Sequence, residues 1–205
     1  GVSSFDQMPL QYGFWEPDRA YNEKLPLIIW LHGAGEGGKD PMAAYAGNNV
    51  ISLSTQKIQK YFEMGACILV PQAPTRWLDP GDEPPAGMTF IGNENLAKAQ
   101  LTAERNNSGK DSMDKIMWYI TKKGYSIYTE GLKALIDEFI EDRPYIDRDR
   151  VYLGGCSNGG FMTMRMMLSY PEIFAAYFPV CEAYYDAILT DEDINKIKDY
   201  NIWFV

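Results

Sequence analysis

The feature that most constrains this chain is a strand-like run that leads into a serine flanked by glycines. Residues 151–153 (Val-Tyr-Leu) are apolar and indicate a short buried strand, while residues 161–170 are rich in Met and Leu, as in a helix. Between them, residues 155–159 (Gly-Cys-Ser-Asn-Gly) fit the pattern Gly-x-Ser-x-Gly. So sharp a turn strains the backbone at Ser157, needs glycine where side chains would collide, and leaves the serine hydroxyl exposed.

Two interpretations of Ser157 are open on this pattern alone. In the first, Ser157 is a nucleophile, and the unpaired N–H groups of the following helix lie beside any oxyanion that forms. In the second, the segment is an ordinary strand-to-helix turn in which Ser157 is the N-cap. A second motif favours the nucleophile.

The second motif also follows a strand. Residues 25–31 (Leu-Pro-Leu-Ile-Ile-Trp-Leu) form a near-continuous apolar run, which is typical of a strand buried on both faces of a parallel sheet. Residues 32–38, which come next, are His-Gly-Ala-Gly-Glu-Gly-Gly. Functional residues of such sheets gather at the carboxyl ends of the strands, and His32 and Ser157 both lie just past such ends.

The alternation of strands and helices predicts an α/β fold, with a mainly parallel sheet and helices on both faces. Further strands are expected at 9–16, 66–70, 174–181 and 202–205, and helices at 55–63, 128–143 and 191–199. Residues 1–205 are expected to form a single domain. The segment 76–120 is rich in Pro, Gly and Asp and is predicted to be a lid-like insertion over the active-site edge.

Composition narrows the functional classes. The chain has 205 residues and a formal net charge of −9, which argues against nucleic acid as a partner. No apolar stretch is long enough to span a membrane. Three cysteines (Cys67, Cys156 and Cys181) lie in or beside apolar runs and are expected to be buried free thiols. No Cys/His spacing indicates a metal site, and no cofactor is expected.

The two glycine-rich motifs, in this order, resemble those of the α/β-hydrolase family. His-Gly-Ala-Gly at 32–35 is similar to its oxyanion loop, and residues 155–159 are similar to its nucleophile elbow. More narrowly, the motifs resemble the esterase branch near polyhydroxybutyrate depolymerases and feruloyl or acetylxylan esterases. Prolyl-oligopeptidase-type peptidases are close neighbours. The resemblance covers roughly residues 9–205.

The resemblance implies a role for each motif residue. Ser157 is expected to be the nucleophile, and the backbone N–H groups of Asn158 and Ala34 are expected to form the oxyanion hole. The residues expected to support this loop are His32, Gly33 and Gly35. His32 is expected to hold the loop through hydrogen bonds rather than to act as the general base.

The chain departs from the family pattern in its catalytic triad, which runs Ser, then Asp or Glu, then His. The only histidine in the sequence is His32, which precedes Ser157. Either the chain is part of a longer enzyme that supplies the acid and histidine beyond Val205, or it is a natural pseudo-hydrolase that acts as a binding protein. The first is favoured, because residues 201–205 would otherwise end as an unpaired strand.

Several side chains have two expected roles. Glu182 and Asp186, just past the strand at 174–181, could supply the acid, but solvated loop carboxylates are the expectation. Trp77 either lines the acyl or alcohol pocket or packs the insertion onto the sheet. The methionines of the helix at 161–170 are expected to be core residues.

The expected activity is that of a serine esterase acting on a small-molecule or polysaccharide-linked ester. A peptidase of the prolyl-oligopeptidase type is the alternative enzyme. Ester substrates are favoured because the sequence shows no propeller or other gating domain. The compartment, cytoplasmic or secreted, is left open by the composition.

Overall fold

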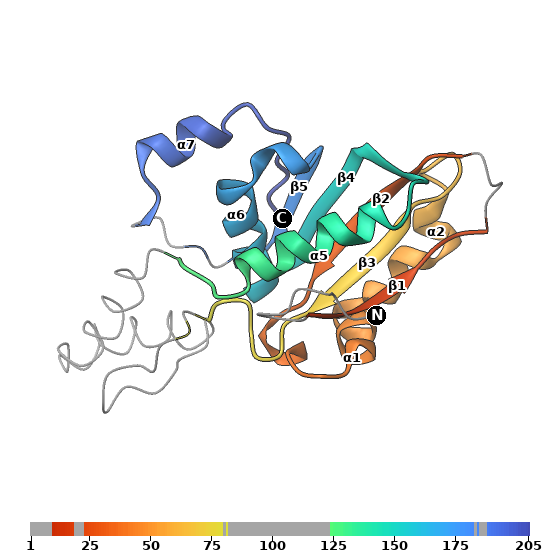
Figure 1. The fold of residues 1–205 in the computed structure, drawn as a ribbon, viewed down its shortest axis with the longest axis horizontal. Helices are drawn as coiled ribbons and strands as arrows, with labels where there is room; N and C mark the ends of the chain where they lie inside the picture. Colours follow the sequence, from red (N-terminus) through yellow and green to blue (C-terminus); the bar gives the residue numbers. More distant parts are fainter. Residues whose placement is uncertain (1–9, 19–22, 80, 82–123, 183, 185–187) are drawn as a thin grey trace.

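The structure is a computed structural model, and it describes residues 10–18, 23–79, 81, 124–182, 184 and 188–205. Its centre is a five-stranded sheet in the order β1-β3-β2-β4-β5 (Figure 1). The strands are β1 (Gln11–Trp15), β2 (Leu25–Leu31), β3 (Cys67–Gln72), β4 (Ile146–Cys156) and β5 (Ala176–Val180). Only β1 is antiparallel to its neighbour β3, and the other three pairings are parallel. The predicted α/β fold with a mainly parallel sheet is confirmed.

Helices connect the parallel strands, as the crossovers require. The longer ones are α5 (Thr129–Glu141), α6 (Asn158–Ser169) and α7 (Asp191–Ile197). The shorter elements are α1 (Pro41–Ala46), α2 (Gln56–Gln59) and the 3₁₀ segments η1 (Ala34–Glu36), η2 (Gly47–Ser54) and η3 (Pro171–Ile173).

The helix expected at 55–63 is too long, because α2 spans four residues only. Beyond α2 the backbone continues in tighter turns, with Phe62 N–H donating to Gln59 O at 3.0 Å, and the Gln59 side chain turns back to the strand that follows. Gln59 Oε1 accepts a hydrogen bond from Ala66 N–H at 2.7 Å, and Gln59 Nε2 donates to Ala66 O at 3.2 Å. Gly65, with φ of 83°, then reverses the chain into β3.

The sheet is buried on both faces, as its apolar runs predict. Alternate residues of a strand face opposite sides. In β3, Cys67 and Leu69 belong to the larger core beneath α5 and α6, whereas Ile68 and Val70 pack against residues of α1 and η2. Figure 1 shows α5 lying across one face of the sheet, with α1 and α2 on the other. The four methionines of α6 are buried in the larger core, as expected.

The C-terminal segment extends the sheet beyond β5. Residues 201–205 run parallel to β5, with Ile202 paired to Tyr177. The backbone hydrogen bonds are Tyr177 N–H to Asn201 O (2.8 Å), Trp203 N–H to Tyr177 O (2.8 Å), Val205 N–H to Pro179 O (3.1 Å) and Cys181 N–H to Val205 O (2.7 Å). The strand expected at 202–205 is thus present only as one isolated bridge with flanking hydrogen bonds, and residues 203–205 are exposed rather than buried.

Most of the segment predicted as a lid lies outside the described residues, which include only 76–79 and 81 of it, so the lid remains a prediction. The chain on either side of the gap is described and comes together. Ile127 N–H donates to Asp79 O at 2.9 Å, and Ser126 Oγ donates to Trp77 O at 2.5 Å. The chain thus leaves and returns just beyond the carboxyl end of β3. Within the described ranges, no helix is long and apolar enough to cross a membrane.

Candidate active site

Ser157 occupies a strained turn between β4 and α6. Its φ of 56° and ψ of −111° belong to neither strand nor helix, and its side chain makes no capping hydrogen bond to α6. Such a conformation costs about 1–3 kcal/mol in a residue other than glycine. The turn is held by the Ser157 N–H, which donates to Val180 O at 2.9 Å. Ser157 therefore stands at the N-cap position of α6 but lacks the side-chain hydrogen bond of an ordinary N-cap, and its role as the nucleophile remains a prediction.

The two glycines of the motif are required by contacts between the turn and the end of β2. A Cβ on Gly155 would lie 2.6 Å from the carbonyl carbon of Gly159 and 2.7 Å from Leu31 O. A Cβ on Gly159 would lie only 2.0 Å from Leu31 O. The backbone of β2 could move away only by breaking its pairing with β4, so the first turn of α6 approaches β2 this closely only with glycine.

The same approach brings the loop after β2 beside Ser157. A Cβ on Gly33 would lie 3.7 Å from Cys156 O, the carbonyl of the residue before Ser157. Ala34 and Gly35 follow in η1 and are exposed. The sequence motifs at 32–35 and 155–159 are thus neighbours at the carboxyl edge of the sheet, while the catalytic roles expected of their residues remain predictions.

Both ring nitrogens of His32 are engaged by backbone groups. Nε2 accepts a hydrogen bond from Ala73 N–H at 3.0 Å, so Nδ1 carries the proton and donates to Gly33 O at 2.6 Å. The side chain is 1% exposed and ties the end of β2 to the end of β3. Neither nitrogen is free to take a proton from Ser157, as general-base catalysis would require.

Burial sets the charge of His32. Desolvation lowers its pKa from 6.5 to about 4, and the hydrogen bond to Gly33 O opposes this only in part. The imidazole is therefore neutral at neutral pH, the form in which Nε2 can accept from Ala73.

Asn158 has a role that the sequence did not reveal. Its side chain is 1% exposed, and Oδ1 accepts hydrogen bonds from Trp77 N–H at 2.6 Å and Leu78 N–H at 3.3 Å. One amide oxygen thus holds the loop after β3 against the start of α6. The sequence predicts a role only for the backbone N–H of Asn158, because nothing in it indicates that residues 77 and 158 meet.

Trp77 lies in the core behind these loops. It is 0% exposed and packs against the rings of His32 (centroids 5.0 Å apart) and Tyr128 (6.0 Å, edge to face). Its position fits the second of the two expected roles, packing of the insertion onto the sheet. Lining of a pocket by Trp77 remains a prediction.

Glu36 ties the loop after β2 to two further elements. Its Oε1 accepts from Asn48 Nδ2 at 2.8 Å, and its carbonyl accepts from Gln72 Nε2 at 2.8 Å. Asn48 and Asn49 have positive φ values of 46° and 58°, a conformation that asparagine tolerates better than most residues. These contacts were not expected from the sequence.

The expectation of three buried thiols is wrong for two of them. Cys67 is buried in the core, but Cys156 is half-buried and Cys181 is exposed. The apolar runs that contain Cys156 and Cys181 end at these residues, so both thiols lie at the open carboxyl edge of the sheet rather than inside it. Their sulfur atoms are 3.4 Å apart.

The carboxylates considered as catalytic acids are only partly described. Glu182 follows β5, is half-buried, and accepts from Tyr184 N–H at 2.5 Å. Asp186 lies outside the described residues. Within the described part of the chain, no group of three or more His, Cys, Asp or Glu side chains could hold a metal ion.

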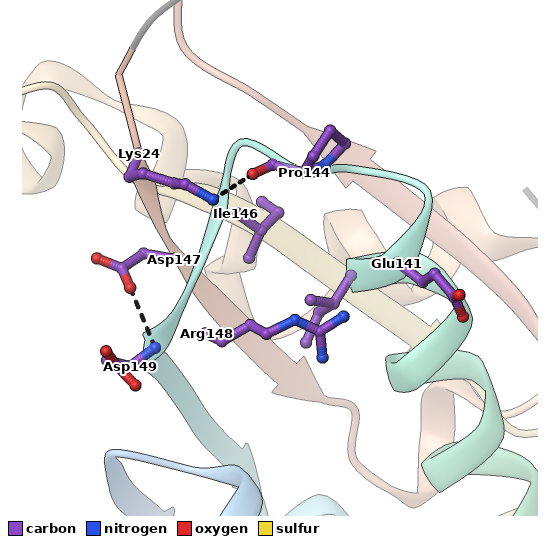
Figure 2. Close-up of a pocket in the computed structure, with 8 residues that line it drawn as sticks. Lys24, Glu141, Pro144, Ile146, Asp147, Arg148 and Asp149 are labelled. Atoms are coloured by element: carbon purple, nitrogen blue, oxygen red, sulfur yellow. Dashed lines mark hydrogen bonds between the residues drawn. The ribbon is translucent and has the colours of Figure 1, made fainter.

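A surface pocket of about 460 Å³ lies at the opposite end of β4 from Ser157 (Figure 2). Its lining residues are Lys24, Ile140, Glu141, Pro144, Ile146, Asp147, Arg148 and Asp149. Lys24 Nζ donates to Pro144 O at 2.5 Å across it. Because β4 spans on the order of 30 Å, this pocket is separate from the turn at Ser157.

Comparison with solved structures identifies the fold. A crystal structure of a thermostable esterase matches with a TM-score of 0.61 and 24% sequence identity, over 96% of this chain and 42% of that chain. The chain has the α/β-hydrolase fold. It spans less than half the length of that esterase.

Further comparisons give partial or weaker matches. A model of the prolyl oligopeptidase family matches residues 120–203. An acetyl xylan esterase from Aspergillus awamori matches with TM-score 0.47 and 16% identity, over 89% of this chain and 52% of that one. An acylaminoacyl peptidase matches with TM-score 0.47 and 16% identity, over 96% of this chain and 28% of that chain. Among curated proteins, none matches.

The single histidine of the chain makes the stability of the fold depend on pH. The pKa of His32 is about 4 in the folded state and near 6.5 when unfolded, so the unfolded state binds the proton more tightly between these values. The stabilisation that neutral His32 contributes is complete above its unfolded-state pKa of 6.5 and is lost as the pH falls toward 4. Urea unfolding should show a loss of about 2 kcal/mol from this group between about pH 7 and pH 5.

The variant His32→Gln should lack this component. It is expected to be less stable than the parent at both pH values, because a buried hydrogen-bonded side chain is replaced. Its free energy of unfolding should nevertheless fall by about 2 kcal/mol less than the parent's between pH 7 and pH 5. Equal losses in the two proteins would show that His32 does not titrate as described.

Gly159→Ala should destabilise the fold strongly. The new Cβ would overlap Leu31 O, and two packed backbone segments would have to separate, at a cost of about 3 kcal/mol or more in urea unfolding. Gly35→Ala is the matched control, since nothing lies within 4 Å of its Cβ position. A Gly159→Ala protein as stable as the control would mean that the turn and β2 are not in this contact.

Asn158→Ala should cost on the order of 3 kcal/mol, because the backbone N–H groups of Trp77 and Leu78 lose their acceptor in a buried site. Thr163→Val serves as a control on the same helix. Thr163 is also buried, but its hydroxyl donates to Gly159 O and leaves no orphaned group behind, so about 1 kcal/mol is expected. Equal costs in urea unfolding would contradict the anchoring role of Asn158.

Proposed function

We propose that this protein is a serine hydrolase that cleaves carboxylic esters through an acyl-enzyme on Ser157. The observation that carries the proposal is the strained turn at Ser157, with φ of 56° and no capping hydrogen bond, beside the loop at 32–35. A serine held in this way at some energetic cost is typical of a nucleophile elbow rather than of a helix cap.

The chemistry begins with attack of Ser157 Oγ on the ester carbonyl carbon. The negative charge that develops on the carbonyl oxygen is proposed to be stabilised by the backbone N–H groups of Asn158 and Ala34. Each such donor contributes about 3–4 kcal/mol in known oxyanion holes. The positive end of the α6 dipole, at Asn158, adds to this stabilisation. Collapse of the intermediate expels the alcohol and leaves the acyl group on Ser157, and water then releases the acid.

The general base is proposed to be a histidine beyond Val205, together with the acid that orients it. His32 is the only histidine of these residues, and its two nitrogens are occupied by Gly33 O and Ala73 N–H. The chain also spans only 42% of the thermostable esterase with the same fold. Both observations support a catalytic pair supplied by a longer polypeptide.

The substrate class is proposed to be a small-molecule or polysaccharide-linked ester, in keeping with the motifs and with the esterase of the same fold. The match of residues 120–203 to the prolyl oligopeptidase family favours a serine peptidase as the second candidate. Ester and amide hydrolysis use the same acyl-enzyme, so turnover of p-nitrophenyl acetate and of a p-nitroanilide peptide by one preparation would distinguish the two.

Labelling with a fluorophosphonate tests the nucleophile directly. A protein that continues beyond Val205 should be labelled on Ser157, and Ser157→Ala should abolish labelling while circular dichroism stays unchanged. Ser169→Ala, at the far end of α6, should be labelled like the parent. A folded, longer protein that resists the probe would instead support a pseudo-hydrolase that acts in binding.

A polypeptide limited to residues 1–205 should turn over p-nitrophenyl acetate very slowly. Loss of the triad base typically lowers kcat on the order of 10⁶-fold, and only the oxyanion hole and binding then act. Full activity in this short protein would place the base within residues 1–205 and would contradict the proposed triad.

A further inference from the structure

Two thiols meet at the carboxyl edge of the sheet, directly beside Ser157. Cys156 is the last residue of β4 and precedes Ser157, while Cys181 follows the last residue of β5. Their sulfur atoms are 3.4 Å apart. A disulfide bond is about 2.05 Å long, so closure needs the sulfurs to approach by little more than 1 Å.

The backbone places these residues within the range that a disulfide spans. Cys156 is paired with Val180 across the parallel strands β4 and β5, and Cys181 is one residue further along. With strands about 4.8 Å apart and a rise of about 3.3 Å per residue, the two Cα atoms are roughly 6 Å apart, inside the usual window for disulfides.

The turn at Cys181 explains why the sulfurs meet. In regular extended backbone, residue 181 would point to the opposite face of the sheet from residue 180 and its partner Cys156. Cys181 instead has a positive φ of 36°, which takes the chain out of the strand. Cys181 N–H still donates to Val205 O at 2.7 Å, so the backbone there is held rather than free.

The two thiols differ in how they can react. Cys181 is exposed, so a small molecule in solution reaches it, whereas Cys156 is half-buried. Burial raises the pKa of the Cys156 thiol to about 11, with further contributions from its hydrogen bond to Cys181, the charge of Cys181 and Glu36. Cys156 is therefore a poor first attacker, but its contact with Cys181 makes it a well-placed second one.

We propose that Cys156 and Cys181 are a redox-modified pair, which a low-molecular-weight disulfide such as glutathione disulfide oxidises to an intramolecular disulfide beside Ser157. The thiolate of Cys181 attacks one sulfur of glutathione disulfide, breaks its S–S bond and expels one glutathione thiolate. The thiolate of Cys156 then attacks the Cys181 sulfur and expels the second. The protein dithiol loses two electrons and two protons, and glutathione disulfide gains them as two thiols.

The bond would constrain the turn that carries Ser157. It would join the residue before Ser157 to the end of β5, where Val180 O already accepts from Ser157 N–H. It would also close the loop of residues 156–181 around α6, which reduces the entropy of the unfolded chain and should raise Tm. Formation of this bond does not depend on whether Ser157 is a nucleophile.

The test is oxidation of the reduced protein with glutathione disulfide, followed by blocking of free thiols with iodoacetamide and mass analysis of peptides. Oxidation should remove two hydrogen atoms from the mass of the reduced parent and leave one free thiol, on Cys67, for iodoacetamide to block. The digest should contain a linked peptide with Cys156 and Cys181. No glutathione should remain attached. Cys67→Ala is the matched control and should form the same link.

The single variants separate the two steps. Cys156→Ser should accumulate one glutathione on Cys181, because the second attack is removed. Cys181→Ser should remain largely unmodified, because only the half-buried Cys156 is left at this edge. Circular dichroism of each reduced variant checks that the fold is retained.

Three results would overturn the proposal. These are a parent that retains glutathione on Cys181 without forming the link, a parent whose three thiols all stay free, and a bond that forms between two molecules rather than within one. If the link forms but fluorophosphonate labelling fails in both the reduced and oxidised protein, the redox pair stands and the proposed hydrolase function falls.

Discussion

The close approach of the first turn of α6 to the end of β2 is the constraint on which the rest of this edge depends. Gly155 and Gly159 allow the two backbones to touch, since a Cβ on either would lie within 2.7 Å of Leu31 O. The chain turns sharply at Ser157, the one residue between β4 and α6. The positive φ of Ser157 accompanies this packing, which the two glycines permit.

Two buried polar side chains then hold the surrounding loops in place. His32 joins the end of β2 to the end of β3 through Ala73, and Asn158 joins the start of α6 to the loop at Trp77. Each uses a neutral side chain to satisfy backbone groups that would otherwise be buried without a partner. The ring of Trp77 packs against His32, so the two anchors belong to one contiguous structure. A turn held in this way can keep a strained residue without relaxing.

The sequence predicted those features that depend on local patterns. The apolar run at 25–31 identified β2 at its observed bounds, and the glycine spacing predicted the turn at Ser157. The sequence did not predict the features that depend on contacts between residues far apart in the chain. The side chain of Asn158 is anchored by residues about eighty positions away, and Cys181 is exposed because its strand ends at the edge of the sheet. The helix at 55–63 is shorter than expected because the backbone after Gln59 forms tighter turns, and Gly65 then reverses it into β3.

The direction of the last segment bears on where a catalytic acid could come from. Residues 201–205 run parallel to β5, so a chain that continues past Val205 emerges at the same carboxyl edge as Ser157. It would do so two strand positions from β4, or about 10 Å across the sheet. The geometry of the sheet edge is therefore compatible with a triad completed by a longer polypeptide, while His32, tied to Gly33 and Ala73 within the core, holds the loop on which the oxyanion hole is proposed to depend.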